Sequence, residues 1–94
     1  MLRERAPVED LEIEGIVVDV TRPAPDLVGR ATVLAPVQGS PRKVRIDVAG
    51  DDWNTANDAM VRHILLRCRG DLVREGKLYV LRAARDLRLA PTDD

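Results

Sequence analysis

The chain has 94 residues, enough for one domain with a modest core, and 45% of them are apolar, which argues against wholesale disorder. A single cysteine excludes an intrachain disulfide, and no apolar run is long enough to span a bilayer. Residues 1–10 are charged and lack the apolar centre of a signal peptide, so we expect a cytoplasmic protein. The strong excess of Arg over Lys fits a GC-rich bacterial genome.

The net charge of −1 is unevenly distributed along the chain. Residues 1–29 carry three basic and seven acidic side chains, whereas residues 62–89 carry eight basic and three acidic ones. A basic second half could attract phosphate groups. Arginines that solubilise the outer face of strands explain it as well, and the interleaved acids favour this second interpretation.

The first predicted element is a strand over residues 11–21, preceded by a flexible lead-in over residues 1–10. The apolar positions of this strand change parity at Gly15. One extra residue at a glycine is how a β-bulge resets the inward face of a strand, so we expect a bulge there. Under this register Val17 points outward.

Two further strands follow a proline-rich loop at residues 22–26. Residues 30–37 predict the second strand, and residues 43–49 predict the third through a strict apolar–polar alternation. The turn residues at 38–41 lie between them. The second and third strands should therefore form a hairpin.

A short helix is expected next, beginning near Asp52 after Gly50. Either Asp51 or Asp52 could cap it by accepting orphan backbone N–H bonds. Its apolar face combines one large residue, Trp53, with small alanines that allow close approach to the end of a barrel. A helix of about three turns cannot stand alone, so packing must stabilise it.

The period then changes from three or four residues to two, which indicates a second hairpin. Residues 64–72 predict the fourth strand, with Cys68 and Gly70 on its inward face. Residues 77–82 predict the fifth, which later leucines could extend. Residues 91–94 form a tail. We therefore expect a single domain over residues 11–90.

This order of elements resembles an OB-fold, a five-stranded barrel with one helix between the third and fourth strands. Residues 52–81 also resemble a module that recurs in actinobacterial proteins of unknown function. The matching residues are Asp52, Trp53, Ala56, Ala59, Leu66, Cys68, Gly70, Leu72 and Leu81. Met60 stands where that module commonly has His. The resemblance implies a fold and carries no settled activity.

No catalytic or cofactor motif stands out in the sequence. It has no glycine-rich phosphate loop, no metal-spaced Cys or His pair and no elbow serine. His63 is better explained as a helix C-terminal residue than as a base, and Cys68 as a core residue than as a nucleophile. The acidic residues Asp51, Asp52 and Asp58 are a weak basis for a metal site. We expect a non-enzymatic protein without cofactor or metal.

Protein interaction or self-association is the leading functional hypothesis. The predicted registers leave four aliphatic side chains on the outside, and neighbouring strands could merge them into one patch that suggests a partner. These residues are Val17, Leu65, Leu78 and Val80. Scattered surface aliphatics are ordinary in globular proteins, which is the simpler explanation.

The alternative is weak, largely sequence-independent binding of single-stranded nucleic acid. The predicted outward cations are Arg30, Lys43, Arg45, Arg67 and Arg69. OB barrels that bind such strands also use stacking aromatic residues, and this chain has only Trp53 and Tyr79, both expected to face inward. The two hypotheses differ in salt dependence, because phosphate binding weakens as salt rises.

Overall fold

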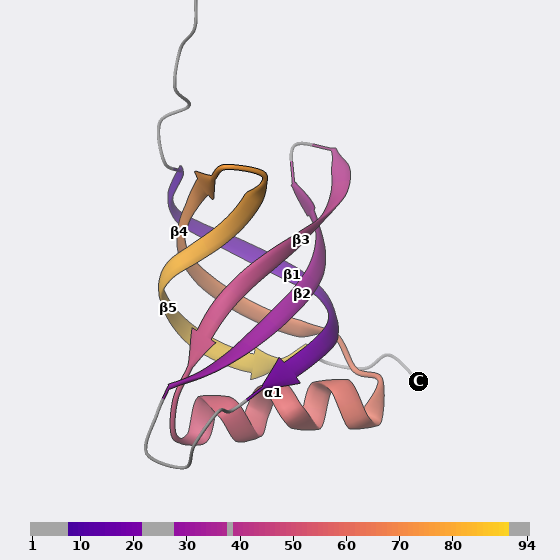
Figure 1. The fold of residues 1–94 in the computed structure, drawn as a ribbon. Coiled ribbons are helices and arrows are strands. Elements are labelled where there is room, and N and C mark those ends of the chain that lie inside the picture. The colour runs from indigo at the N-terminus through magenta and orange to yellow at the C-terminus, as the bar shows by residue number, and fades with distance from the viewer. Residues whose placement is uncertain (1–7, 22–27, 38, 91–94) are drawn as a thin grey trace, which may run out of the picture.

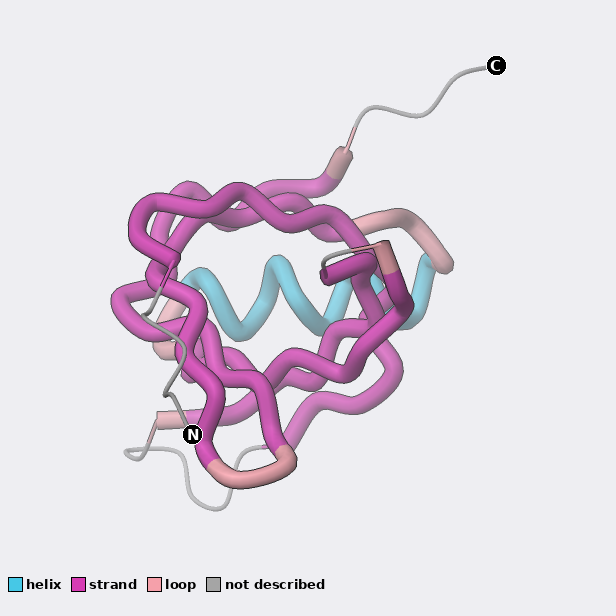
Figure 2. The backbone as a smooth tube through the Cα atoms, turned by 90° about the horizontal axis from the view of Figure 1, so that it is seen from above, coloured by secondary structure: helices cyan, strands magenta, loops and turns pink. Residues whose placement is uncertain are grey.

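The computed structural model describes residues 8–21, 28–37 and 39–90. Its elements are β1 (Val8–Thr21), β2 (Gly29–Val37), β3 (Ser40–Val48), α1 (Asp51–Arg62), β4 (Leu66–Glu75) and β5 (Leu78–Leu89). The strands close into a barrel in the order β1-β2-β3-β5-β4, with α1 lying across one end (Figures 1 and 2). The predicted five-stranded barrel with one helix between its third and fourth strands is confirmed.

Several sequence predictions concern chain that lies outside the described residues. They are the loop at 22–26, the tail at 91–94 and most of the lead-in. The last three residues of the expected lead-in instead belong to β1, which begins at Val8. Within the described ranges, no helix combines the length and the apolarity needed to cross a membrane.

Strand β1 pairs with two neighbouring strands in succession. Its first part pairs with β4 as far as Gly15 opposite Leu66, and its second part pairs with β2 from Ile16 opposite Leu34. A Cβ at Gly15 would lie 2.3 Å from the backbone oxygen of Leu34. The glycine therefore allows β2 to approach β1 at the point where β1 changes partner.

The predicted bulge at Gly15 is wrong. Ile13, Gly15 and Val17 are all buried in one uninterrupted alternation, and the register with β2 shifts only between Val17 and Asp19. Val17 is 3% exposed and belongs to the core, whereas Ile16 is 52% exposed. The prediction assumed that apolar residues of β1 point inward, but β1 carries aliphatic side chains on its outer face as well.

The two predicted hairpins are confirmed. Strands β2 and β3 pair from Gly29 opposite Val48 to Val37 opposite Ser40, and β4 and β5 are joined by a tight turn at Gly76. A parallel contact joins the middle of β3 to the start of β5, from Val44 opposite Tyr79 to Ile46 opposite Leu81. Beyond that contact the two hairpins project separately from the end of the barrel opposite α1 (Figure 1).

Strand β5 is longer than predicted because it contains two irregularities. Ala83 and Asp86 both have positive φ, and the register with β4 shifts beside each of them. Each shift adds one residue to β5, so its inward and outward positions recur every three residues instead of every two. The outward series is Arg82, Arg85 and Arg88, and the inward series is Leu81, Ala84 and Leu87.

Helix α1 closes the barrel through its small residues. Ala56 and Ala59 are buried, and Trp53 packs so closely on Gly29 that a Cβ there would lie 2.5 Å from its indole ring. The expected aspartate cap is wrong, since Gly50 is the N-cap and makes no side-chain bond. The helix ends at His63, whose backbone is left-handed and donates to the last turn, as a C-cap does.

The interior of the barrel is aliphatic. Cys68 is fully buried among the largest core side chains, and a Cβ on Gly70 would lie 2.7 Å from Leu81. Both inward predictions for β4 are therefore correct. Burial raises the pKa of the Cys68 thiol to about 12, which leaves it protonated and unreactive.

Candidate nucleic-acid interface

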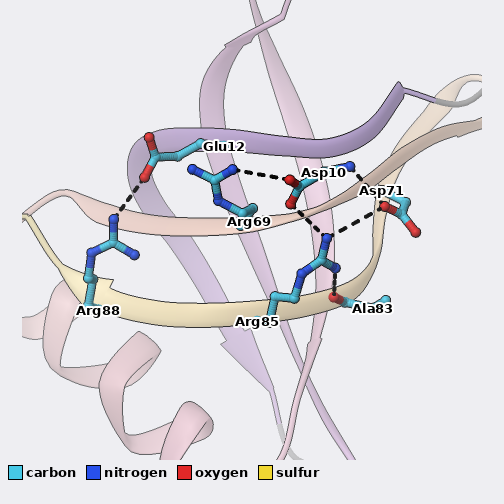
Figure 3. Close-up of polar contacts among 7 residues, drawn as sticks. All are labelled: Asp10, Glu12, Arg69, Asp71, Ala83, Arg85 and Arg88. Carbon is cyan, nitrogen blue, oxygen red and sulfur yellow. Dashed lines mark hydrogen bonds and ion pairs between the residues drawn. The ribbon is translucent and has the colours of Figure 1, made fainter.

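One outer face of the barrel is covered by ion pairs. We define the ion-paired face by its members on β1, β4 and β5, namely Asp10, Glu12, Glu14, Arg67, Arg69, Asp71, Arg85 and Arg88. Figure 3 shows its central part, where Arg85 and Arg88 reach across β4 to the acids of β1. The acidic N-terminal region and the basic C-terminal region of the sequence meet here.

Arginines from two adjacent strands face each other on this surface. Arg67 lies opposite Arg88, and Arg69 lies opposite Arg85. Such like-charged neighbours would repel each other if they were left alone. The carboxylates of β1 neutralise them, with Glu14 2.8 Å from Arg67 and Glu12 2.8 Å from Arg88.

Two of the five predicted nucleic-acid-binding cations therefore already have partners. Arg67 binds Glu14, and Arg69 lies 3.4 Å from Asp10. Arg85 shares the same Asp10 at 2.8 Å. A phosphate group at this face would compete with carboxylates that are held in register, so the face offers little net attraction to an anion.

The predicted apolar interaction residues do not form one patch. Val17 is in the core, and Leu65 is exposed in the segment between α1 and β4. Leu78 is exposed and Val80 half-buried on β5, beside the outer face of β3. Only the last two lie together, and they share their surroundings with cations.

A continuous hollow runs along the outer face of β3. Three adjoining depressions make it up, and they have common lining residues: Lys43, Leu78 and Tyr79 join the first two, and Arg45 joins the second to the third. We call this hollow the basic groove. Its cations are Arg30, Arg42, Lys43, Arg45, Arg74, Lys77 and Arg82.

Most cations of the basic groove have no carboxylate partner among the described residues. Arg82 is the exception, because it pairs with Glu75. Asp19 and Asp47 also line the groove, but neither is within ion-pair distance of a described cation. The remaining six positive charges are therefore available to a ligand.

The floor of the groove is apolar. Val18 and Leu78 are exposed there, and Leu34 and Val80 are half-buried beside them. Tyr79 lines two of the three depressions while also packing against the core. The groove thus combines charge with surfaces on which planar groups can rest.

The comparisons with known proteins add no family assignment. No protein-family model, curated protein or solved structure matches this chain. The function must therefore be argued from the geometry of the faces described above.

Other chemistries find little support in the part of the chain that the structure describes. No group of three or more His, Cys, Asp or Glu side chains there is arranged to hold a metal ion. The buried Cys68 has a raised pKa, and His63 lies exposed at the end of α1. Among the described residues, neither side chain has the oriented partner that a nucleophile or a general base requires.

Sequence reasoning found part of the groove and missed the rest. Arg30, Lys43 and Arg45 were predicted and do line it, whereas Arg74 and Lys77 were not singled out. A signal was present, since these two cations flank the turn glycine Gly76 and so mark the tip of the second hairpin. What the sequence did not disclose is that both hairpin tips lie on one cleft.

Proposed function

We propose that this protein is a non-catalytic module that binds single-stranded nucleic acid in the basic groove, mainly through backbone phosphates. The observation that carries the proposal is the contrast in charge pairing between the two faces. Six groove cations have no described carboxylate partner, whereas the arginines of the opposite face are ion-paired. Neutralisation of phosphates by Lys and Arg supplies most of the affinity in sequence-independent binding.

The shape of the site favours a single strand over a duplex. The groove follows β3, and residues 41–47 of an extended strand span about 20 Å. Small OB-type barrels bind about 4 nucleotides or more in such grooves, with bases against aromatic or apolar side chains. Exposed Val18 and Leu78 offer such a surface.

A protein partner is the other candidate occupant, and the same exposed aliphatic residues favour it. An added protein strand would need the open edge of β3, where Pro41 has no N–H to donate and Arg42 and Lys43 follow. Proline and charge are devices that discourage strand addition. We therefore favour the polyanion.

The test is fluorescence anisotropy of labelled oligothymidylate and oligouridylate with the intact chain, at about 50 and 200 mM salt. Six phosphate contacts to a single strand predict a slope of log affinity against log salt of about −4. No binding at low salt would contradict the proposal. Binding that is insensitive to salt would point to apolar association instead.

A matched pair of variants locates the site. Lys43→Gln with Arg45→Gln removes two groove charges, and Arg67→Gln with Arg69→Gln removes two charges from the ion-paired face. The first should reduce the salt slope by about 1.4, whereas the second should leave it unchanged. Equal losses in both variants would show that binding follows net charge and not the groove.

A further inference from the structure

The tips of the two hairpins form the most positively charged part of the basic groove. The cleft between them has a volume of about 400 Å³, within the range of about 300–1,000 Å³ that small-ligand sites occupy. We call it the tip cleft. Its lining residues are Leu34, Pro41, Arg42, Lys43, Arg74, Lys77, Leu78 and Tyr79.

Among the residues that the structure describes, no acidic side chain lines the tip cleft, although four cations do. Glu75 is adjacent to Arg74 in the sequence, but its carboxylate is engaged by Arg82. Elsewhere in the groove Asp19 and Asp47 partly offset the positive charge. An anionic group is therefore attracted most strongly between the hairpin tips.

Arg74 is held in position before any ligand arrives. Its Nε donates a hydrogen bond of 3.1 Å to the carbonyl of Gly76, and its guanidinium lies 5.6 Å from the centre of the Tyr79 ring. Because Arg74 lies directly opposite Tyr79 in the β4–β5 ladder, the backbone register keeps the guanidinium beside the ring. Each of the two groups is planar, and we call the pair the Arg74–Tyr79 platform.

The opposite wall of the cleft is stiff as well. Pro36 lies opposite Pro41 near the tip of the β2–β3 hairpin, and both have a fixed φ. Arg42 and Lys43 follow directly on β3 and line the cleft. Two positively charged hairpin tips thus line the cleft, and the two prolines limit the backbone freedom that the β2–β3 tip loses on binding.

We infer that the tip cleft is a subsite for one nucleotide unit, in which the base stacks on the Arg74–Tyr79 platform. The phosphate of that nucleotide lies among the cations of the two tips, Arg42, Lys43 and Lys77. The inference rests on the proposed function and gives it a ligand chemistry, a planar base beside a phosphate. A unit of this kind can come from a strand or from a free mononucleotide.

The test compares a thymidine tetramer, an abasic tetramer of the same length and thymidine monophosphate, each titrated into the intact protein at about 50 mM salt. The wild-type protein should bind the thymidine tetramer about 5-fold or more tightly than the abasic one, because stacking contributes at least about 1 kcal/mol per base. Tight binding of the tetramer with weak binding of the monophosphate identifies a strand as the source.

Two variants separate stacking from charge. Arg74→Lys keeps the positive charge and loses the planar guanidinium, so it should reduce the preference for bases, with Tyr79 still present, while abasic binding is unchanged. Lys77→Gln should weaken both tetramers by the same factor. Arg74 and Lys77 are exposed, and unchanged thermal unfolding of each variant would exclude a folding defect.

The outcomes distinguish the two proposals. Equal binding of both tetramers by the wild-type protein, or an undiminished base preference in Arg74→Lys, would overturn the subsite while leaving groove binding intact. Binding of the monophosphate as tightly as the tetramer would support the subsite and contradict the strand-binding function. Failure of longer oligonucleotides to bind at low salt would overturn both.

Discussion

The two outer faces of the barrel are rich in the same residue type and use it in opposite ways. On the ion-paired face, guanidinium groups of Arg67, Arg85 and Arg88 each lie 2.8 Å from a carboxylate of β1. Along β3, Arg42, Lys43 and Arg45 have no carboxylate partner among the described residues. The difference arises from register, because β1 places its acids beside β4 in its first part and turns to β2 in its second.

This contrast shows why net charge is a poor guide to binding. The chain as a whole has a charge of −1, and its most basic segment is residues 62–89. Much of that segment is neutralised by the N-terminal acids once the barrel closes. The unpaired charge lies mainly along β3 and at the tips of the two hairpins.

The largest expected effect comes from breaking the junction between the two faces. Gly15→Val would place a side chain where a Cβ alone lies 2.3 Å from the Leu34 carbonyl and 2.8 Å from Ala35. We expect a loss of about 3 kcal/mol in the free energy of unfolding, measured by urea denaturation. Ile16→Val, at the exposed neighbouring position, should change it by less than about 0.5 kcal/mol. An unchanged midpoint for Gly15→Val would contradict the close approach of β2.

Cys68, on the inner side of the ion-paired face, gives the next effect when it is counted per pH unit. Burial raises the pKa of Cys68 from 9.0 to about 12, so the unfolded chain loses the thiol proton first as pH rises. The free energy of unfolding should therefore fall by about 1.4 kcal/mol per pH unit between about pH 9 and 12 from this group. Cys68→Ala removes this contribution, and parallel pH profiles for the two proteins would show that the thiol is not desolvated.

A smaller effect is expected when a carboxylate is introduced into the basic groove, so that one of its cations becomes ion-paired. Thr32 lies opposite Arg45 on the outer face, so Thr32→Glu places a carboxylate beside that guanidinium. We expect oligothymidylate affinity to fall about 10-fold, and the free energy of unfolding to rise by about 0.2–1 kcal/mol. Thr32→Gln has the same shape without the charge and serves as the control. Equal affinity of the Glu and Gln variants would mean that Arg45 contacts no phosphate.

The smallest change in the free energy of unfolding is expected when an ion pair of the ion-paired face is removed. Arg85→Gln removes contacts to Asp10 and Asp71 that are partly exposed, so the free energy of unfolding should fall by no more than about 1 kcal/mol. Arg62→Gln, in the exposed last turn of α1, is the matched control and should cost only about 0.3 kcal/mol, through the lost interaction with the helix dipole. Oligonucleotide affinity should be the same in both variants. A weaker oligonucleotide affinity in Arg85→Gln, but not in Arg62→Gln, would show that the ligand binds the ion-paired face.

The sequence was sufficient for the architecture because local signals agreed with the fold. The alternation of β3, the turn at Gly76 and the small face of α1 each specify their element within a few residues. Strand β5 was predicted too short because the irregularities at Ala83 and Asp86 convert its period from two to three. No local pattern distinguishes such a strand from a loop or a helix.

The candidate site was only half predictable for a different reason. Local alternation correctly placed Lys43 and Arg45 on the outer surface, but it gave no information about which cations would meet carboxylates. Arg67 pairs with Glu14 across 53 positions of sequence. Val17 was placed on the wrong face for another reason: its neighbours Ile16 and Val18 are aliphatic but exposed, so apolar parity did not identify the inward side of β1.

Amide chemical-shift perturbation on the isotopically labelled protein would show directly whether a single strand binds in the basic groove. Oligothymidylate at low salt should shift the amides of residues 42–45 and 74–80, with little change at residues 10–14 and 67–71. This pattern would place the ligand in the basic groove. Perturbations concentrated on the ion-paired face, or absent at saturating oligonucleotide, would contradict the account.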